Sequence, residues 1–420
     1  MTTQVLGLQS LEFPSIIRPG DTVMWGQSTA EPVPLTQALM AQRHAIGRFN
    51  VFLGVTYSDV VKPEHADCVS FSAYSGGGRN RALAEAGRLD ILPVHYSQFP
   101  QLISRGGLKI DVLLLQLAPA DAQGNYSLSM AHEYLIPALD AARVVVAEVN
   151  EQAPWTWGER PVRGEEIDYI VHTSRPPLEL HHRPPGEAEL AVARHVAGLI
   201  DDGATLQFGL GSLPEAMLSA LAGHRDLGIH TGAIGDKAAE LIEAGVITNS
   251  RKTVDRGFAV AGVMFGSERI QKFCHRNPAV QFRSPAYTHN AEVLSRIERF
   301  VALNSAIEVD LTGQINAEVA GGVYVGAVGG ALDFLRGAHR SKGGLPIVTL
   351  PSTAGKVSRI AARLSGPVTT PRSDAGIIVT EHGVADLRGA PLSDRARRMI
   401  AIAHPDFREE LEREAELLYN

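Results

Sequence analysis

Short, nearly continuous apolar runs recur along the chain and alternate with segments of helical periodicity. The clearest runs are Ile110–Gln116, Ala142–Val149, Ile347–Leu350 and Gly376–Thr380. Runs of this length are typical of parallel strands that are buried on both faces of a sheet. Helical patterns lie between such runs, at Arg81–Gly87, Met130–Ala142 and Glu187–Ile200. The alternation predicts an α/β fold with open parallel sheets.

A strand, a glycine turn and a helix occur twice in the same order. Gly20–Gly26 and Gly203–Gly209 both read Gly-x-Thr-aliphatic-x-aromatic-Gly, and each precedes a polar loop, a proline and an apolar helix. Strand–loop–helix units share this outline by chance, but the matched order of residue types goes beyond it. The aperiodic, proline-rich segment Arg175–Gly186 is predicted to be a linker. We therefore predict two similar domains, residues 1–180 and 187–420.

Composition narrows the class of protein. The 420 residues are 45% hydrophobic, which suits a protein of two domains. The net charge is −7, and the chain lacks the basic stripe of a nucleic-acid-binding surface. Only Cys68 and Cys274 occur, so we expect reduced thiols and a cytoplasmic protein. No signal peptide and no apolar run of roughly 18 residues is recognisable, so we expect no membrane partner. The 15 histidines include no His-Glu-x-x-His pattern, and no metal site is predicted.

Two glycine loops are candidates for ligand binding. Gly209-Leu-Gly211 follows a predicted strand and opens a helix, where free N–H groups favour negative charge. Gly326-Ala-Val-Gly329-Gly330 follows a predicted strand at Val323–Val325, and its glycines can supply backbone donors to a developing oxyanion. A tight structural turn is the alternative interpretation of each loop.

Motifs along the whole chain carry a family resemblance. They are Asp111–Gly124, Val146–Asn150, Leu227–Asn249, Leu303–Glu318, Ser341–Gly344, Leu350–Thr353, Val379–Gly389 and Ile402–Arg408. In these the chain resembles the acetyl-CoA hydrolase/transferase family, in the branch that includes 4-hydroxybutyrate CoA-transferase. The resemblance implies a class I CoA-transferase fold with two similar open α/β domains and an active site at their interface. It also implies acyl-CoA and a small acceptor as substrates, no metal, and a homodimer or higher homo-oligomer.

The chain departs from the family where the chemistry takes place. In the resembled branch a glutamate attacks the acyl-CoA thioester, and the resulting enzyme–CoA thioester is resolved by an acceptor carboxylate or by water. That position is Gly232 here, and the corresponding position of another branch is Ala286. Further changes fall at Gln98, Ala327 and Ala331, whereas the scaffold motifs are intact. The pattern favours a CoA-ester fold with a modified reaction.

Three functional hypotheses follow. In the first, the acyl group is transferred or hydrolysed directly, without a glutamyl-CoA thioester. His230, Asp236 and Glu31 are then the candidate catalytic acid–base groups, and the two glycine loops hold CoA and the oxyanion; a structural, backbone-bonded His230 is the alternative. In the second, a conventional acyl-CoA:carboxylate CoA-transferase uses a displaced carboxylate, such as Glu31, Glu133 or Glu308. In the third, the protein is a non-catalytic CoA-ester binding subunit.

Overall fold

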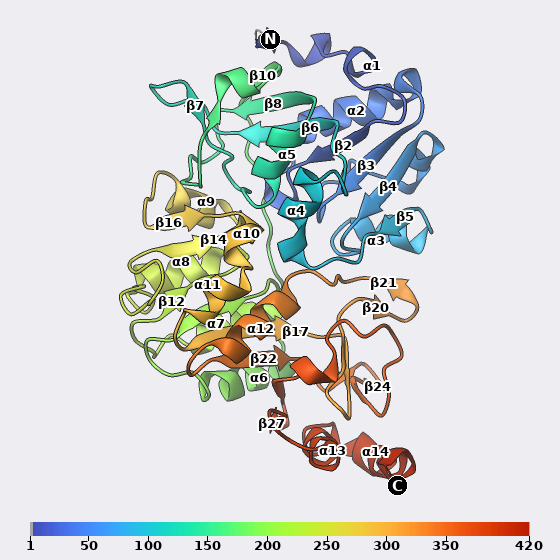
Figure 1. The fold of residues 1–420 in the computed structure, drawn as a ribbon, viewed down its shortest axis with the longest axis vertical. Helices are drawn as coiled ribbons and strands as arrows, with labels where there is room; N and C mark the ends of the chain where they lie inside the picture. The colour runs from blue at the N-terminus through green and yellow to red at the C-terminus, as the bar shows by residue number, and fades with distance from the viewer. Residues whose placement is uncertain (1–2, 420) are drawn as a thin grey trace.

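The computed structural model describes residues 3–419, so residues 1, 2 and 420, at the outer ends of the predicted domains, lie outside the described residues. Two open sheets with helices on their faces are stacked end to end (Figure 1). Each consists of parallel strands, apart from one antiparallel edge pair in the second sheet. The predicted α/β class with two similar domains is confirmed.

The first sheet has eight strands, all parallel to their neighbours. In spatial order they are β1 (Gln4–Leu6), β10 (Tyr169–Thr173), β8 (Val144–Asn150), β6 (Val112–Leu117), β2 (Thr22–Trp25), β3 (Phe49–Leu53), β4 (Val69–Ala73) and β5 (Leu89–Ile91). Its helices are α1 (Phe13–Ile16), α2 (Val33–Ile46), α3 (Asn80–Glu85), α4 (Phe99–Ser104) and α5 (Leu135–Ala141).

The central strands of this sheet are buried on both faces. All six residues of β6 are buried. Val112 and Leu114 pack with α1 and α2, whereas Leu113 and Leu115 pack with α4 and α5 on the opposite face. This division follows from the alternation of side chains along a strand, and it explains why Val112–Leu115 is apolar without a break.

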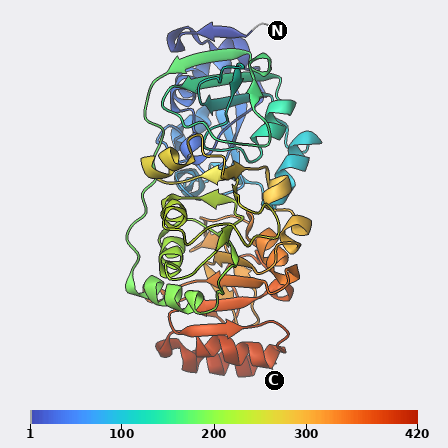
Figure 2. The same cartoon turned by 90° about the vertical axis from the view of Figure 1, so that its left-hand side faces the viewer.

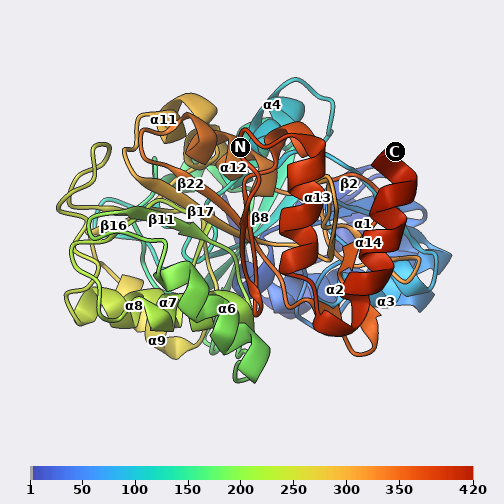
Figure 3. The ribbon, with the colours of Figure 1, turned by 90° about the horizontal axis from the view of Figure 1, so that it is seen from below.

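The second sheet has six strands. In spatial order they are β12 (Gly228–Ile229), β11 (Thr205–Phe208), β17 (Phe300–Ser305), β22 (Leu345–Thr349), β26 (Ile377–Thr380) and β27 (Gly383–Asp386). Helices α6 (Glu187–Ala197), α7 (Ser212–Ala220), α8 (Asp236–Glu243) and α9 (Glu268–Cys274) lie along one face of this half, and α11 (Ala291–Ser295) and α12 (Ala331–Arg340) lie along the other (Figure 3). Helices α13 (Leu392–Ala401) and α14 (Pro405–Tyr419) close the far end (Figure 2). Within the described range, no helix combines the length and apolarity needed to cross a membrane.

Both halves also contain shorter helices and strands. They are β7 (Asn125–Tyr126), β9 (Val162–Arg163), β13 (Ala233–Ile234), β14 (Ala259–Ala261), β15 (Val263–Met264), β16 (Val280–Phe282), α10 (Pro285–Thr288), β18 (Glu308–Asp310), β19 (Ile315–Asn316), β20 (Val319–Ala320), β21 (Val323–Tyr324), β23 (Thr353–Ala354), β24 (Val357–Ser358) and β25 (Ile360–Ala361). The predicted strand at Val323–Val325 is therefore part of a two-stranded antiparallel pair and not of the main sheet.

The two halves share an apolar core and a network of backbone bonds. One cluster of buried apolar side chains runs from Met24 in the first sheet to Ile377 in the second. The connecting segment after β10 runs along the side of the molecule to α6 (Figure 2). Arg175 anchors its start, because its guanidinium donates to the fully buried carboxylate of Glu148 at 2.7 and 2.9 Å. The contact between the halves is thus part of the folded core.

The largest difference from the predicted elements lies at Met130–Ala142. Helix α5 begins only at Leu135, and the five preceding residues form an irregular turn. The Met264 N–H donates to the Met130 carbonyl at 2.7 Å, and the His132 N–H donates to the Gly262 carbonyl at 3.1 Å. These bonds to the second half replace helical bonds, and they bring Glu133 to the boundary between the halves.

Candidate active site

A cavity of about 240 Å³ lies where the two halves meet, beside the carboxyl ends of β11 and β17. Its lining comes from both halves: Gln27, Val55, Tyr57, Tyr74, Tyr96, Glu133, Gln207, Phe208, Gly209, Leu210, Gly232, Ala233, Val263, Phe265, His289, Asn304, Gly329, Gly330, Ala331 and Phe334. In open α/β sheets, ligands bind beyond the carboxyl ends of the strands. The position and the mixed lining make this cavity the candidate active site.

Glu133 is held in the cavity wall by a strained turn. Its φ is +35°, a left-handed conformation that costs a non-glycine residue about 1–3 kcal/mol and is concentrated at functional sites. Residues next to it bond to the second half, as described above, so the docking of the halves fixes the turn.

The Glu133 carboxylate is buried but receives strong hydrogen bonds. Gln27 Nε2 donates to its two oxygens at 2.8 and 2.7 Å, and the Tyr96 hydroxyl donates to Oε1 at 2.6 Å. Gln27 is oriented in turn, because its Oε1 accepts from the Tyr74 hydroxyl at 2.8 Å and from the Val55 N–H at 2.9 Å. Burial raises the pKa of Glu133 to about 7, against the opposing effect of the Tyr96 and Gln27 hydrogen bonds. The carboxyl group can therefore both take up and release a proton near neutral pH.

Gly232 faces the same cavity, and His289 occupies the space beside it. A Cβ on Gly232 would lie 3.2 Å from Cε1 and 3.3 Å from Nε2 of His289. The imidazole packs between Tyr96 and Phe334, with ring centroids 4.9 and 4.3 Å away. Burial lowers the pKa of His289 to about 3, so the ring is neutral. An uncharged ring thus borders Gly232.

Gly262 separates Gly232 from Glu133. The Gly262 N–H donates to the Gly232 carbonyl at 2.9 Å. A Cβ on Gly262 would lie 2.9 Å from that carbonyl oxygen and 3.5 Å from Cγ of Glu133. The carboxylate of the first half and the bare position of the second half therefore border one small space.

The two glycine loops contribute unequally to the cavity. Gly209, Gly329 and Gly330 line it, and α12 begins directly after Gly330, so the first N–H groups of that helix have no partner within the helix. Gly211, with φ +119°, caps α7. Gly326 lies against the first half, where its carbonyl accepts from the Gly76 N–H at 2.9 Å. A Cβ on Gly326 would approach the Ala317 carbonyl to 1.9 Å, so close backbone packing accounts for this glycine.

The three acid–base candidates from the sequence lie outside the cavity lining. Asp236 accepts from the Ser267 and Ile270 N–H groups at 2.9 and 3.0 Å and so holds the start of α9. His230 is buried, with Nε2 3.2 Å from the Thr288 carbonyl oxygen, and burial lowers its pKa to about 3.

The other two carboxylates considered from the sequence are also engaged in structural contacts. Glu31 accepts from the Tyr57 N–H at 2.6 Å and from the Ser58 hydroxyl at 2.6 Å, and burial raises its pKa. Glu308 accepts from the Ser365 and Gly366 N–H groups at 2.7 and 3.0 Å. Of the carboxylates considered from the sequence, Glu133 is the one that lines the cavity.

Three cavity residues were not among the site residues predicted from the sequence. Gln27 directly follows the Gly20–Gly26 segment, and Tyr96 lies two residues before the family departure at Gln98. His289 lies three residues after Ala286. For Tyr96 and His289 the signal is proximity in the chain to a departure from a family motif, which does not specify which neighbour is involved, and Gln27 lacks this signal.

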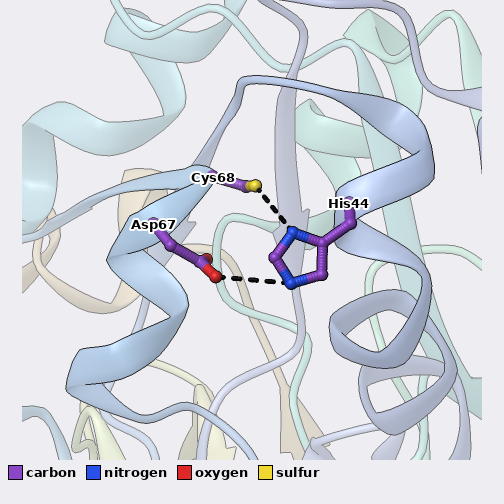
Figure 4. Close-up of side chains that lie close together, drawn as sticks. All are labelled: His44, Asp67 and Cys68. Carbon is purple, nitrogen blue, oxygen red and sulfur yellow. Dashed lines mark hydrogen bonds and ion pairs between the residues drawn. The ribbon is translucent and has the colours of Figure 1, made fainter.

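A separate cluster of His44, Asp67 and Cys68 lies on the surface of the first half (Figure 4). The His44 ring lies between its partners, with Nδ1 3.3 Å from the Cys68 Sγ and Nε2 3.4 Å from an Asp67 oxygen. Arg43 holds both Asp67 oxygens at 2.9 and 3.0 Å and lowers the pKa of Asp67 to about 2. Because the two ring nitrogens point to different partners and the carboxylate pairs with a guanidinium, the cluster is arranged as a surface ion-pair network.

Fold and cavity together define a two-domain α/β protein with an apolar ligand site between its halves. Comparison with known families matches residues 8–178 to the acetyl-CoA hydrolase/transferase N-terminal domain and residues 266–415 to the acetyl-CoA hydrolase/transferase C-terminal domain. The chain belongs to the acetyl-CoA hydrolase/transferase family, as its motifs indicated, and it is an enzyme of the acyl-CoA transferase and hydrolase class.

Individual relatives agree with this assignment. The 4-hydroxybutyrate coenzyme A transferase of Clostridium kluyveri is 39% identical over 395 residues, which are 93% of this chain and 92% of that protein. The crystal structure of RipA from Yersinia pestis superposes with a TM-score of 0.94 at 33% identity, covering 99% of this chain and 98% of that one. A 4-hydroxybutyrate CoA-transferase from Porphyromonas gingivalis gives a TM-score of 0.84 at 34% identity, with 99% and 98% covered.

Proposed function

We propose that this enzyme catalyses the direct attack of a protic acceptor on an acyl-CoA thioester, with Glu133 as the general base. The observation that carries the proposal is a buried carboxyl group with a pKa of about 7 that lines the same cavity as Gly232. A general base is useful only if the acceptor has a proton to lose, as water, an alcohol or an amine has. Hydrolysis, with water as acceptor, is the simplest such reaction.

The reaction then needs no covalent enzyme intermediate. Water attacks the thioester carbonyl carbon while Glu133 takes its proton, and the oxyanion is stabilised by backbone N–H groups near Gly329 and Gly330. The C–S bond breaks, the CoA thiolate leaves with the electron pair, and protonated Glu133 returns the proton to the sulfur. CoA and the free acid are released, and the enzyme is regenerated.

A second candidate is the conventional double displacement with Glu133 as the displaced nucleophile. It is favoured by Oε2 of Glu133, which accepts a single hydrogen bond, from Gln27, and so retains lone pairs for attack. A buried, more basic carboxylate is also a better nucleophile than an exposed one. The two candidates differ in whether a Glu133–CoA thioester forms.

One set of variants tests both candidates. Purified protein is incubated with a panel of acyl-CoA esters and with water, amine, alcohol or acetate as acceptor, and the products and intact protein are analysed by mass spectrometry. Glu133→Gln is expected to lower kcat by about 10²–10⁴-fold, the usual contribution of a general base. The matched variants Glu31→Gln and Glu308→Gln remove buried carboxylates that lie outside the cavity, and we expect them to retain turnover.

The outcomes are distinct. Full activity in Glu133→Gln would refute both candidates. A CoA adduct on Glu133 that hydroxylamine removes would establish the double displacement and refute the direct attack. Loss of turnover in Glu133→Gln, together with unmodified wild-type protein during turnover, would support the direct attack.

A further inference from the structure

The charge of the cavity lining restricts the acyl group. Among the lining residues, all of which fall in the described range 3–419, there is no lysine or arginine, and the one carboxyl group is that of Glu133. The lining histidine, His289, is neutral because burial lowers its pKa to about 3. The remaining polar groups are tyrosines, amides and backbone. The cavity therefore offers no cation to a charged group on the substrate.

The amides of the lining do not replace a cation. Gln207 and Asn304 bond to each other, with Gln207 Nε2 3.3 Å from Asn304 Oδ1 and Asn304 Nδ2 3.0 Å from Gln207 Oε1. The Gln27 amide nitrogen already donates to the Glu133 carboxylate and to the Tyr96 hydroxyl. A carboxylate entering the cavity would have to displace one of these pairs in order to receive a hydrogen bond from a side-chain amide.

The size and the apolar surface of the cavity favour a short chain. About 240 Å³ equals the liquid volume of about eight water molecules at roughly 30 Å³ each. A four-carbon acyl thioester has six non-hydrogen atoms, four carbons with one oxygen and one sulfur, so an acyl chain of this length fits together with a small acceptor. Val55, Val263, Phe208, Phe265 and Phe334 supply apolar wall for such a chain.

We propose that the acyl group of the substrate is short and uncharged, derived from a monocarboxylic acid, and that acyl groups with a second carboxylate are rejected. The inference rests on the proposed function in taking this cavity as the acyl site. A terminal carboxylate would be buried with no cation in the lining and beside Glu133, which is itself ionised above neutral pH. Burial of an unpaired charge next to a like charge is strongly unfavourable.

Binding of two matched thioethers tests the proposal without turnover. S-butyl-CoA and S-(3-carboxypropyl)-CoA have equal chain length up to the terminal group, and neither has the reactive carbonyl. By titration calorimetry at pH 8 we expect the carboxylated compound to bind at least ~100-fold more weakly, the usual order for a buried unpaired charge. Equal or tighter binding of the carboxylated compound would overturn the proposal.

A pair of variants tests whether the lack of a cation in the cavity lining causes the difference in affinity. Val55 is half-buried in the cavity wall, so Val55→Arg can place a guanidinium there, and Val55→Met is the uncharged control of similar reach. We expect Val55→Arg to narrow the affinity ratio at least ~10-fold and Val55→Met to preserve it. An unchanged ratio in Val55→Arg would contradict the charge argument.

The binding and turnover assays separate the acyl preference of the cavity from the role of Glu133. If the affinity ratio is as expected but Glu133→Gln turns over normally, the acyl preference stands and the role of Glu133 falls. If Glu133→Gln is inactive but the two thioethers bind equally, the role of Glu133 is supported and the acyl preference is refuted.

Discussion

The Glu133→Gln substitution is expected to stabilise the folded protein above neutral pH while it removes turnover. Burial raises the pKa of Glu133 from its ordinary value of 4.5 to about 7. Below pH 4.5 the carboxyl group is protonated in both the folded and the unfolded chain. Between pH 4.5 and 7 the unfolded chain loses the proton and the folded chain keeps it, so the free energy of unfolding falls as pH rises. Above pH 7 the cost of the buried charge is fully present.

The magnitude follows from the shift. From 4.5 to about 7 is about 2.5 pKa units, and at 1.36 kcal/mol per unit the wild-type protein loses about 3 kcal/mol across this range. The glutamine variant has no ionisable group at this position, so its free energy of unfolding does not fall across this range. Its amide offers one acceptor oxygen in place of two, so a donor on Gln27 or Tyr96 loses its partner, which costs about 0.5–1.5 kcal/mol. That cost is independent of pH and cancels when two pH values are compared.

Urea unfolding at pH 5 and pH 8 measures the effect. The difference in unfolding free energy, variant minus wild type, is expected to be about 2.5 kcal/mol larger at pH 8 than at pH 5, because part of the loss is already present at pH 5. The rise of kcat/KM with pH in the wild type should have its midpoint near 7, because the ionised form is the base. A stability difference that does not change with pH would show that the Glu133 carboxyl group titrates normally, and the reasoning on its role as a base would then fail.

Three further substitutions probe the same site. Tyr96→Phe removes a hydrogen bond that stabilises ionised Glu133, so the acidic limb of the kcat/KM profile should move about one pH unit upward; an unmoved limb would contradict the bond's role. Gly232→Glu should lower the free energy of unfolding by about 1–3 kcal/mol, because its Cβ meets His289, and Gly232→Glu/His289→Ala should recover part of the loss in the same urea assay. Gly330→Ala places a Cβ 2.4 Å from His289 Nε2 and should destabilise by a similar amount, which thermal unfolding can check.

The fold could be predicted from the sequence because its signals are local. The runs at residues 110–116 and 376–380 are mostly apolar because both faces of those strands are covered, and β6 and β26 lie within a few residues of the predicted bounds. The prediction that the helix begins at Met130 was wrong for the opposite reason. The composition of the segment before α5 is helical, but bonds to the second half compete for its backbone groups, and no local pattern reports them.

Only the part of the site that lies in the second half of the protein could be predicted from the sequence. The glycine loops and Gly232 belong to motifs of the second half, and their place beside a cavity followed from strand–loop–helix order. Glu133 was one of three candidates for a displaced nucleophilic carboxylate, and no sequence pattern distinguishes it from Glu31 and Glu308. The choice depends on the cavity, which exists only when residues far apart in the chain meet.

The proposed base and the proposed oxyanion donors come from different halves, and this has a mechanistic consequence. Glu133 belongs to the first half, whereas the backbone donors near Gly329 and Gly330 belong to the second. These groups can act on one thioester only when the halves are docked. The Tyr96 N–H donates to the Gly329 carbonyl at 2.9 Å, and the Ser97 hydroxyl donates to Asp333 at 2.7 Å, so the residue that orients Glu133 is bonded to the donor loop itself. Because the same contacts are continuous with a shared apolar core, the relative position of base and donors is set by folding and not by the substrate.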